Sequence, residues 1–126
     1  MALNVLVIDD SAVMRAMIIR TLHLIDLELG AVLQASNGEE ALSVLDAEWI
    51  DIAFVDINMP VMNGMELLKQ ISTRPYAGCL RTIVVSTEGS DPRIAEVRAY
   101  GAAFVHKPFT PEDLRDVVMR LTGVES

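Results

Sequence analysis

The chain has 126 residues, of which 52% are apolar and 22% are charged, and its formal net charge is −8. This length suits one domain with a single sizeable core. The acidic balance argues against nucleic acid or an anionic membrane surface as a direct partner, because both need a basic footprint. No apolar stretch reaches the roughly 18–20 residues that span a bilayer, and the N-terminus lacks the basic flank of a signal peptide. Cys79 is the single cysteine, which fits a reducing cytoplasm, and we expect it to be a small buried or loop residue rather than a nucleophile.

In the first half of the chain, strand-like and helix-like segments alternate. Residues 4–8 form a continuous apolar run of strand length, and residues 11–27 follow as a helix with Ser11 as its N-cap. The apolar face of this helix is predicted to contain Met14, Met17, Ile18 and Ile25. A short strand over residues 31–35 then leads into a helix over residues 36–47, which opens with a serine or asparagine cap and two glutamates.

The middle of the chain continues the pattern. Residues 51–55 and residues 81–86 are predicted strands, and a helix is predicted between them over about residues 64–72. The strands are apolar on both faces, which indicates a parallel sheet that helices cover on both sides.

The last two units carry the clearest helix signals. A Ser-Asp cap and a proline open the helix over residues 90–100, and Gly101 ends it. A strand follows over residues 102–106. The final helix, residues 110–122, starts with Thr-Pro and has Gly123 just past its end. Five strand–helix units in a row with right-handed crossovers predict a doubly wound α/β sandwich.

Polar side chains gather where the predicted strands end. In an open parallel sheet the functional crevice lies beyond the carboxyl ends of the strands. Each polar residue alone has an ordinary structural explanation, such as a helix cap or a solvated lysine. Their coincidence at four strand ends indicates a functional site instead. The residues at these ends are Asp9 and Asp10, Asp56, Ser86 and Thr87, and Lys107.

Three neighbouring carboxylates repel one another, so a divalent cation is their natural neutraliser. Oxygen ligands suit Mg²⁺, with Mn²⁺ as a substitute, and disfavour zinc, because the edge offers at most His106 as a nitrogen ligand. Such a metal suits a phosphoryl group, which an aspartate can accept as an acyl phosphate. Lys107 and Ser86 would then each hold a phosphoryl oxygen.

Four motifs in order, "VLVIDDS", "VDINMPVMNGMELL", "IVVST" and "HKPFT", resemble the response-regulator receiver domain of two-component signalling. The resemblance covers roughly residues 4–122. It implies a flavodoxin-like (βα)5 three-layer sandwich whose five-stranded parallel sheet has the order 2-1-3-4-5. It also implies a single receiver domain over residues 1–126 without an output domain, similar to the stand-alone chemotaxis regulator.

By this resemblance, Asp56 is the phosphoacceptor and receives its phosphoryl group from a histidine kinase or a histidine phosphotransfer protein. Lys107 pairs with the phosphoryl group, and Pro108 follows it through a cis bond that aims the lysine. The Mg²⁺ ligands would be Asp9, Asp10, Asp56 and the backbone carbonyl of Asn58.

The resemblance also implies a switch between two arrangements of the protein. The hydroxyl of Ser86 would move toward the phosphoryl group, coupled to Phe104 on the fifth strand. Phosphorylation would thereby shift the surface formed by the last two helices and the fifth strand, which binds a downstream protein. Three residues depart from the common pattern: Ser86 stands where threonine is commoner, Thr87 where alanine is more frequent, and Phe104 where tyrosine is frequent.

Further residues are expected to tune or shape the site. Thr87 is bulkier than the usual alanine and is expected to narrow access to the acceptor. Asn58 and Glu88 stand two positions beyond the acceptor and the switch hydroxyl, where the family tunes hydrolysis. Pro60 and Gly64 shape the loop and the helix start beyond the acceptor.

A phosphorylation-controlled binding module is favoured over an enzyme, and we expect no activity beyond phosphotransfer to the protein itself and its dephosphorylation. Chemotaxis-like signalling, a phosphorelay intermediate and a phosphate sink all fit. An aspartyl-phosphate phosphatase would need a second carboxylate at the position of Asn58, which has no titratable proton. A flavin-binding carrier is disfavoured by the acidic first loop and by the few aromatic residues. The protein is expected to be a cytoplasmic monomer or weak dimer.

Overall fold

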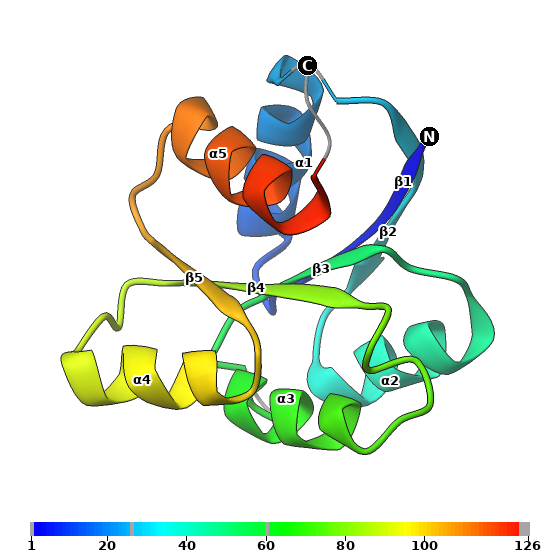
Figure 1. Cartoon of the computed structure of the whole chain (residues 1–126), viewed down its shortest axis with the longest axis vertical. Helices are drawn as coiled ribbons and strands as arrows, with labels where there is room; N and C mark the ends of the chain where they lie inside the picture. The colour runs from blue at the N-terminus through cyan, green and yellow to red at the C-terminus, as the bar shows by residue number, and fades with distance from the viewer. Residues whose placement is uncertain (1, 26, 60, 124–126) are drawn as a thin grey trace.

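The computed structural model describes residues 2–25, 27–59 and 61–123, in which strands and helices alternate along the chain (Figure 1). The strands are β1 (Leu3–Ile8), β2 (Leu29–Ala35), β3 (Ile52–Val55), β4 (Arg81–Ser86) and β5 (Ala103–His106). The helices are α1 (Ala12–Leu24), α2 (Gly38–Ala47), α3 (Gly64–Ser72), α4 (Asp91–Ala99) and α5 (Pro111–Thr122).

The five strands form one sheet of order β2-β1-β3-β4-β5, and every neighbouring pair is parallel. This confirms the predicted order. Figure 1 shows α1 and α5 on one face of the sheet and α2, α3 and α4 on the other. In the register of the central strands, Ile8 lies beside Val55. The strands therefore end at one edge of the sheet, and the residues that follow them meet there.

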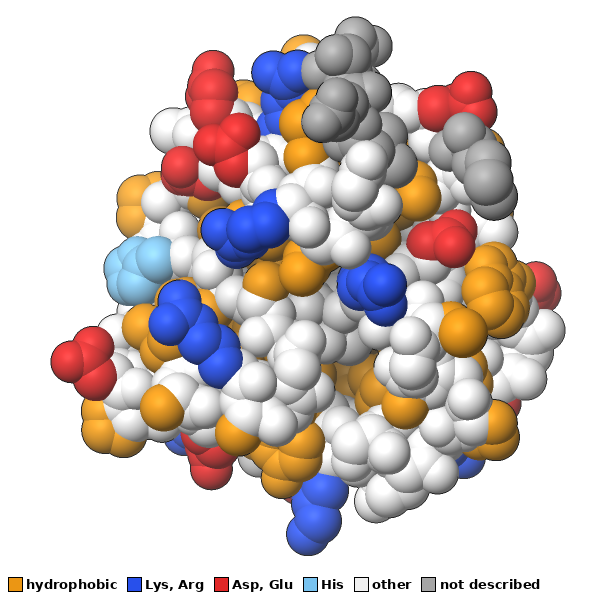
Figure 2. All heavy atoms as spheres, viewed as in Figure 1, with side chains coloured by type: hydrophobic (Ala, Val, Ile, Leu, Met, Phe, Trp, Pro, Cys, Tyr) orange, Lys and Arg blue, Asp and Glu red, His pale blue; other side chains and the backbone are white. Residues whose placement is uncertain are grey.

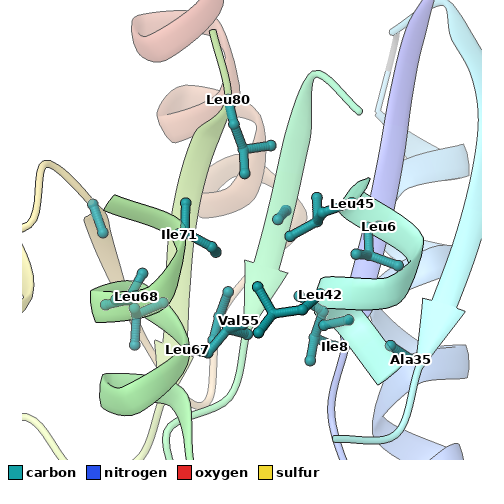
Figure 3. Close-up of a cluster of buried hydrophobic side chains, with 14 of the residues drawn as sticks. Leu6, Ile8, Ala35, Leu42, Leu45, Val55, Leu67, Leu68, Ile71 and Leu80 are labelled. Carbon is teal, nitrogen blue, oxygen red and sulfur yellow. The ribbon is translucent and has the colours of Figure 1, made fainter. Parts of the chain in front are cut away.

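Two hydrophobic clusters hold the three layers together, one on each face of the sheet. All four residues of β3 are buried, because helices cover this central strand from both sides. Val55 packs with Leu42 and Leu67 on the α2–α3 side (Figure 3), whereas Phe54 belongs to the cluster under α1 and α5. Within the described part of the chain, no helix is both long enough and apolar enough to cross a bilayer.

The helix caps are formed as predicted, by side chains that accept a hydrogen bond from a main-chain N–H three residues further on. The N-caps are Ser11, Asn37, Ser90 and Thr110. Gly101 and Gly123 follow α4 and α5 with φ angles of 81° and 70°. Only glycine adopts this left-handed conformation without strain, so both helices end where the glycines predicted.

The prediction for the first helix was wrong in its length and, within its apolar face, at Met17. Met14, Ile18 and Ile25 pack in the cluster under α1 and α5, as expected. α1 ends at Leu24, and Ile25 follows it with extended backbone instead of lying within the helix. The buried stripe consists of Ile18, Thr21 and Leu22, and the side chain of Met17 is 49% exposed. Since Met17 directly precedes Ile18, it points about 100° away from the buried stripe.

Small differences at other boundaries have local causes. β3 starts at Ile52 rather than at Asp51, whose carboxylate accepts a hydrogen bond from the N–H of Asn4 (2.8 Å). β2 starts two residues before the predicted strand, because Leu29 already pairs with Leu3. Cys79 is exposed in the loop between α3 and β4, in line with the predicted loop position.

Candidate functional site

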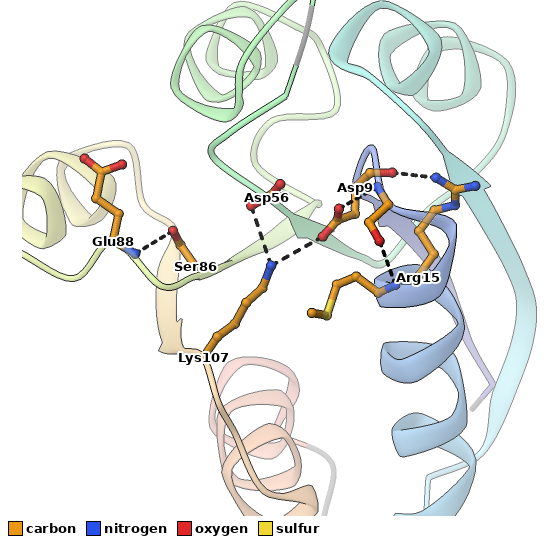
Figure 4. A network of polar contacts seen from close by, with 8 residues as sticks. Asp9, Arg15, Asp56, Ser86, Glu88 and Lys107 are labelled. Carbon is orange, nitrogen blue, oxygen red and sulfur yellow. Dashed lines mark hydrogen bonds and ion pairs between the residues drawn. The ribbon is translucent and has the colours of Figure 1, made fainter.

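Asp9, Asp56 and Lys107 meet at the carboxyl edge of the sheet (Figure 4). The Lys107 Nζ atom lies 3.5 Å from Asp9 Oδ2 and 3.7 Å from Asp56 Oδ1. The two carboxylates belong to the ends of β1 and β3, which are neighbours in the sheet, while the lysine reaches across from the end of β5. The parallel topology thus brings together residues that are distant in sequence.

The main chain holds both buried aspartates. The N–H of Asp9 donates to the carbonyl of Ala35, and the N–H of Asp56 donates to the carbonyl of Ile8. These bonds extend the pairing of the sheet one step beyond the strands. The carboxylate of Asp9 accepts a further hydrogen bond from the N–H of Ser11 (2.9 Å). Asp9 and Asp56 are 2% and 8% exposed, so both carboxylates are held in place and shielded from water.

Asp9, Asp10 and Asp56 form an acidic cluster, in which one carboxylate oxygen of each lies within 4.8 Å of the others. Asp10 is exposed and opens the cluster to solvent. Carboxylate oxygens at this spacing, with one open side, fit a hard cation such as Mg²⁺, which keeps several water ligands. The donor set is therefore compatible with the predicted metal.

Burial raises the pKa of both buried carboxylates of the cluster. Burial raises the pKa of Asp9 and is the largest influence, partly opposed by the N–H of Ser11 and the charge of Lys107. Burial also raises the pKa of Asp56, and the negative charge of Asp9 raises it further. Lys107 and the main chain of Asn58 lower it again by a smaller amount. One ammonium group thus compensates the three carboxylates only in part.

Ser86 ends β4 and is 1% exposed, but its hydroxyl is engaged with its own loop. Its Oγ atom accepts a hydrogen bond from the N–H of Glu88 (3.0 Å), and its carbonyl accepts one from the N–H of Lys107 (2.9 Å). The carboxylate of Glu88 in turn pairs with Arg93 in α4 (3.2 Å). The Ser86 hydroxyl is thus linked through its loop to α4.

Pro108, Thr87 and Phe104 are the predicted site residues near Ser86 and Lys107, on or directly after the last two strands. The Lys107–Pro108 peptide bond is cis, as predicted. Thr87 is exposed directly after β4. Phe104 is half-buried, packs against the cluster under α2–α4, and tilts against His106 with the ring centroids 6.4 Å apart. The functional roles assigned to these residues from the sequence stay predictions.

The loop after Asp56 is positioned by glycine and by a helix cap. Asn58 is exposed, and its predicted role as a carbonyl ligand stays a prediction; Pro60 lies outside the described residues. The N–H of Gly64 donates to the carbonyl of Ile57 (2.8 Å), and Asn63 and Glu66 form a capping box at the start of α3. This short connection brings the start of α3 directly against the main chain of Asp56.

Gly64 cannot be enlarged without moving the loop after Asp56. A Cβ atom at this position would overlap the carbonyl oxygen of Asp56 and lie 2.7 Å from the Cα atom of Ile57. We expect Gly64→Ala to lower the free energy of unfolding by about 1–3 kcal/mol, as other overpacking substitutions do. Urea denaturation measures this change. Gly78→Ala is the control, since a Cβ atom there meets nothing within 4 Å, and an equal effect of both substitutions would contradict the steric explanation.

Two arginines that contact this edge were not predicted from the sequence. Arg15 in α1 donates to the carbonyl of Asp9, and Arg93 in α4 pairs with Glu88. Both occupy polar positions of their helices, where periodicity does not distinguish a solvated cation from one that binds a distant loop. Only their contacts in the folded chain identify them.

The sequence model of a protein family, the response regulator receiver domain, matches residues 5–119 of the chain. A chemotaxis protein CheY homolog of Campylobacter jejuni is 34% identical, and the match covers 98% of this chain and 95% of that protein. Chemotaxis protein CheY1 of Helicobacter pylori is also 34% identical, with coverage of 96% and 98%. By contrast, the chain covers 28% of a protein-glutamate methylesterase/protein-glutamine glutaminase of Rhodospirillum centenum, to which it is 32% identical.

Solved structures agree with the sequence matches. The chemotaxis response regulator CheY4 of Vibrio cholerae superimposes with a TM-score of 0.84 at 33% identity, covering 96% of this chain and 99% of that one. A CheX-CheY-BeF3-Mg complex of Borrelia burgdorferi gives a TM-score of 0.86 at 27% identity, covering 98% and 90%. The family model, the relatives and the sheet order agree, and the chain belongs to the response regulator receiver domain family.

Proposed function

We propose that the protein is a phosphorylation-controlled binding module that accepts a phosphoryl group on Asp56 from a histidine kinase or a histidine phosphotransfer protein. The observation that carries the proposal is the buried Asp56 carboxylate, held by the sheet beside Asp9, Asp10 and Lys107. A structural carboxylate has no need of two further carboxylates and a lysine at the same edge.

In the proposed reaction, an oxygen of the Asp56 carboxylate attacks the phosphorus atom of the donor. A P–O bond forms, the P–N bond of the phosphohistidine breaks, and the histidine nitrogen keeps the electron pair. Bound Mg²⁺ would neutralise charge on the transferring oxygens, with Asp9, Asp10 and Asp56 as its ligands. Lys107 already lies 3.7 Å from Asp56 Oδ1 and would bind a phosphoryl oxygen.

The chain's own residues also supply the switch. The Ser86 hydroxyl accepts from the N–H of Glu88, and we propose that it turns to donate to a phosphoryl oxygen once one is present. The loop that carries Glu88 would follow, and through the Glu88–Arg93 pair it would shift α4. Phosphorylation thus favours one of two arrangements rather than creating a new one.

The surface proposed to read this change runs over α4, β5 and α5. It contains a groove of about 440 Å³, lined by Phe104 and Val117 and by charged residues of both signs, namely Arg98, Arg120, Asp113 and Asp116. Figure 2 shows side chains of both charges over α4 and α5. A lining that combines an aromatic ring with charges of both signs suits a polar peptide segment of a downstream protein. By its likeness to CheY proteins, we propose a chemotaxis-like role in the cytoplasm, with a phosphorelay intermediate or a phosphate sink as the alternatives.

An enzymatic function on a separate substrate receives no support from the site. Asn58, at the position where an aspartyl-phosphate phosphatase needs an acid–base carboxylate, offers an amide. We therefore propose that the protein is not an enzyme apart from its own phosphorylation and dephosphorylation.

Treatment with acetyl phosphate and Mg²⁺ tests the acceptor directly. We expect mass spectrometry to detect one added phosphoryl group on the wild type and on Asp116→Asn, which removes an exposed carboxylate from α5. Asp56→Asn should take up none. Uptake that persists in Asp56→Asn would move the acceptor elsewhere. A pull-down with and without beryllofluoride then separates an output module, which gains a partner with the mimic, from a phosphate sink, which does not.

A further inference from the structure

The side chain of Arg15 joins three elements next to the acidic cluster. Its Nη1 atom donates to the main-chain carbonyl of Asp9 (2.6 Å), and its Nε atom donates to Oε1 of Gln34 (2.9 Å). Arg15 lies in α1, Asp9 follows β1, and Gln34 belongs to β2. Figure 4 shows the guanidinium reaching back from the helix to the loop that carries Asp9.

The carbonyl that Arg15 binds belongs to the peptide unit between Asp9 and Asp10. The other polar groups of Asp9 are also engaged, its N–H with Ala35 and its carboxylate with Ser11 and Lys107. With the carbonyl held as well, the orientation of this peptide plane is determined. Because the plane leads directly into the next residue, it also sets where the Cα atom of Asp10 stands.

Asp10 depends on this support more than its two neighbours do. Asp9 and Asp56 are buried, so packing holds their carboxylates, whereas Asp10 is exposed. The position of an exposed side chain follows mainly from its main chain. A charge-assisted hydrogen bond of 2.6 Å to that main chain is therefore a strong constraint on the third carboxylate of the cluster.

We propose that Arg15 is a positioning residue of the Mg²⁺ site, which orients Asp10 through the Asp9 carbonyl and is itself aligned by Gln34. The inference rests on the proposed function, because it concerns the metal that the acceptor reaction would use. Residues that orient metal ligands in this way typically change metal affinity by about 10- to 100-fold when they are removed.

The sign of the effect separates positioning from simple electrostatics. A cation close to a divalent metal repels it, so removal of the Arg15 charge alone would tighten Mg²⁺ binding. Loss of the hydrogen bond to Asp9 would instead weaken binding, since Asp10 is no longer oriented. The two explanations therefore predict opposite changes for the same substitution.

Isothermal titration of Mg²⁺ into the purified protein tests the proposal. We expect Arg15→Ala to bind Mg²⁺ about 10-fold more weakly or worse, and Gln34→Ala to show a smaller loss in the same direction. Arg15→Lys keeps one charged donor for the carbonyl and should stay within about 3-fold of the wild type. Arg20→Ala is the matched control, because it removes an exposed arginine from the same helix and should leave the affinity unchanged.

Urea denaturation in EDTA supplies the second measurement. A purely structural role of Arg15 would lower the denaturation midpoint and leave the Mg²⁺ affinity of the folded protein intact, which overturns the proposal. Affinity of Arg15→Ala equal to or tighter than that of Arg20→Ala overturns it too. Should Arg15→Ala not fold, an Arg15→Lys affinity close to wild type together with weakened Gln34→Ala supports the proposal, and unchanged Gln34→Ala overturns it.

Failure of the proposed function gives a different result. If the wild type binds Mg²⁺ but takes no phosphoryl group on Asp56, the acceptor role is wrong while the comparison of Arg15 variants still holds. If the wild type takes the phosphoryl group but Arg15→Ala binds Mg²⁺ normally, only the role of Arg15 is wrong. Absence of Mg²⁺ binding by the wild type overturns both.

Discussion

Asp56→Asn should stabilise the metal-free protein against unfolding by about 1–3 kcal/mol. One carboxylate oxygen of each aspartate lies within 4.8 Å of the others, and two unit charges about 5 Å apart repel by roughly 3 kcal/mol at an effective dielectric constant of about 20. Removing Asp56 ends its repulsion with Asp9 and Asp10. The lost contact with Lys107, which lies 3.7 Å away, offsets part of the gain.

The same carboxylates make the stability of the metal-free folded protein depend on pH. Burial raises the pKa of Asp9 and of Asp56 above the value of 3.8 expected for the unfolded chain. The folded protein therefore binds these protons more tightly than the unfolded chain does. The stabilisation is complete below the unfolded pKa and is lost as the pH rises through the folded pKa values. In that window, the wild type in EDTA should become more stable as the pH falls, and Asp56→Asn should show less of this effect.

Thermal and urea unfolding in EDTA, with and without added Mg²⁺, measure both effects. Mg²⁺ at 100 times its dissociation constant should stabilise the wild type by about 2.7 kcal/mol, because it binds only the folded state. Added Mg²⁺ should stabilise Asp56→Asn less than it stabilises the wild type. Asp116→Asn provides the control for loss of an exposed negative charge and should change stability by less than about 0.5 kcal/mol. A destabilised Asp56→Asn in EDTA would contradict the repulsion described here.

Phe54→Ala should lower the free energy of unfolding by about 3–5 kcal/mol, the range for a buried aromatic side chain. Phe54 is 1% exposed and lies on the central strand β3, paired with Val7 and Ile83. Its ring belongs to the cluster beneath α1 and α5. Since domains of this size are stable by only about 5–15 kcal/mol, this one substitution should remove a large share of the total.

Urea denaturation followed by circular dichroism measures the loss. The urea concentration at the midpoint should fall, while the slope of the free energy of unfolding against urea concentration stays the same. An unchanged slope indicates that the stability has changed and the compactness of the unfolded chain has not. Val13→Ala is the comparison, because Val13 is 75% exposed. This substitution should change the free energy of unfolding by less than about 0.5 kcal/mol. A loss below about 1 kcal/mol for Phe54→Ala would mean that the core rearranges to fill the cavity.

Much of the candidate site could be predicted before the fold was known. Asp9, Asp56, Ser86 and Lys107 were assigned to the sheet edge because each follows a short apolar run, and short strand–helix units permit few topologies. The structure places all four there. The caps at Ser90 and Thr110 were equally predictable, since a cap depends on a side chain and an N–H only three residues apart.

Other features depend on contacts between distant segments, and here the sequence was insufficient. The apolar face of α1 was misassigned at Met17, because a helix rich in apolar residues offers more than one plausible stripe. Packing against the sheet and α5 selects the stripe of Ile18 and Leu22. In the same way, nothing near Ser86 in the sequence shows that its hydroxyl accepts from the N–H of Glu88.

The order of the elements, the parallel sheet and the set of residues at its carboxyl edge could all be predicted from the amino-acid pattern. These follow from local periodicity and from the handedness of the connections. Only the folded chain shows how this edge is held together, through the contact of Lys107 with two aspartates, the close approach of Gly64 to the Asp56 carbonyl, and the hydrogen bond from Arg15 to Asp9. Each of these joins groups from different elements, and their distances are set only when the layers pack.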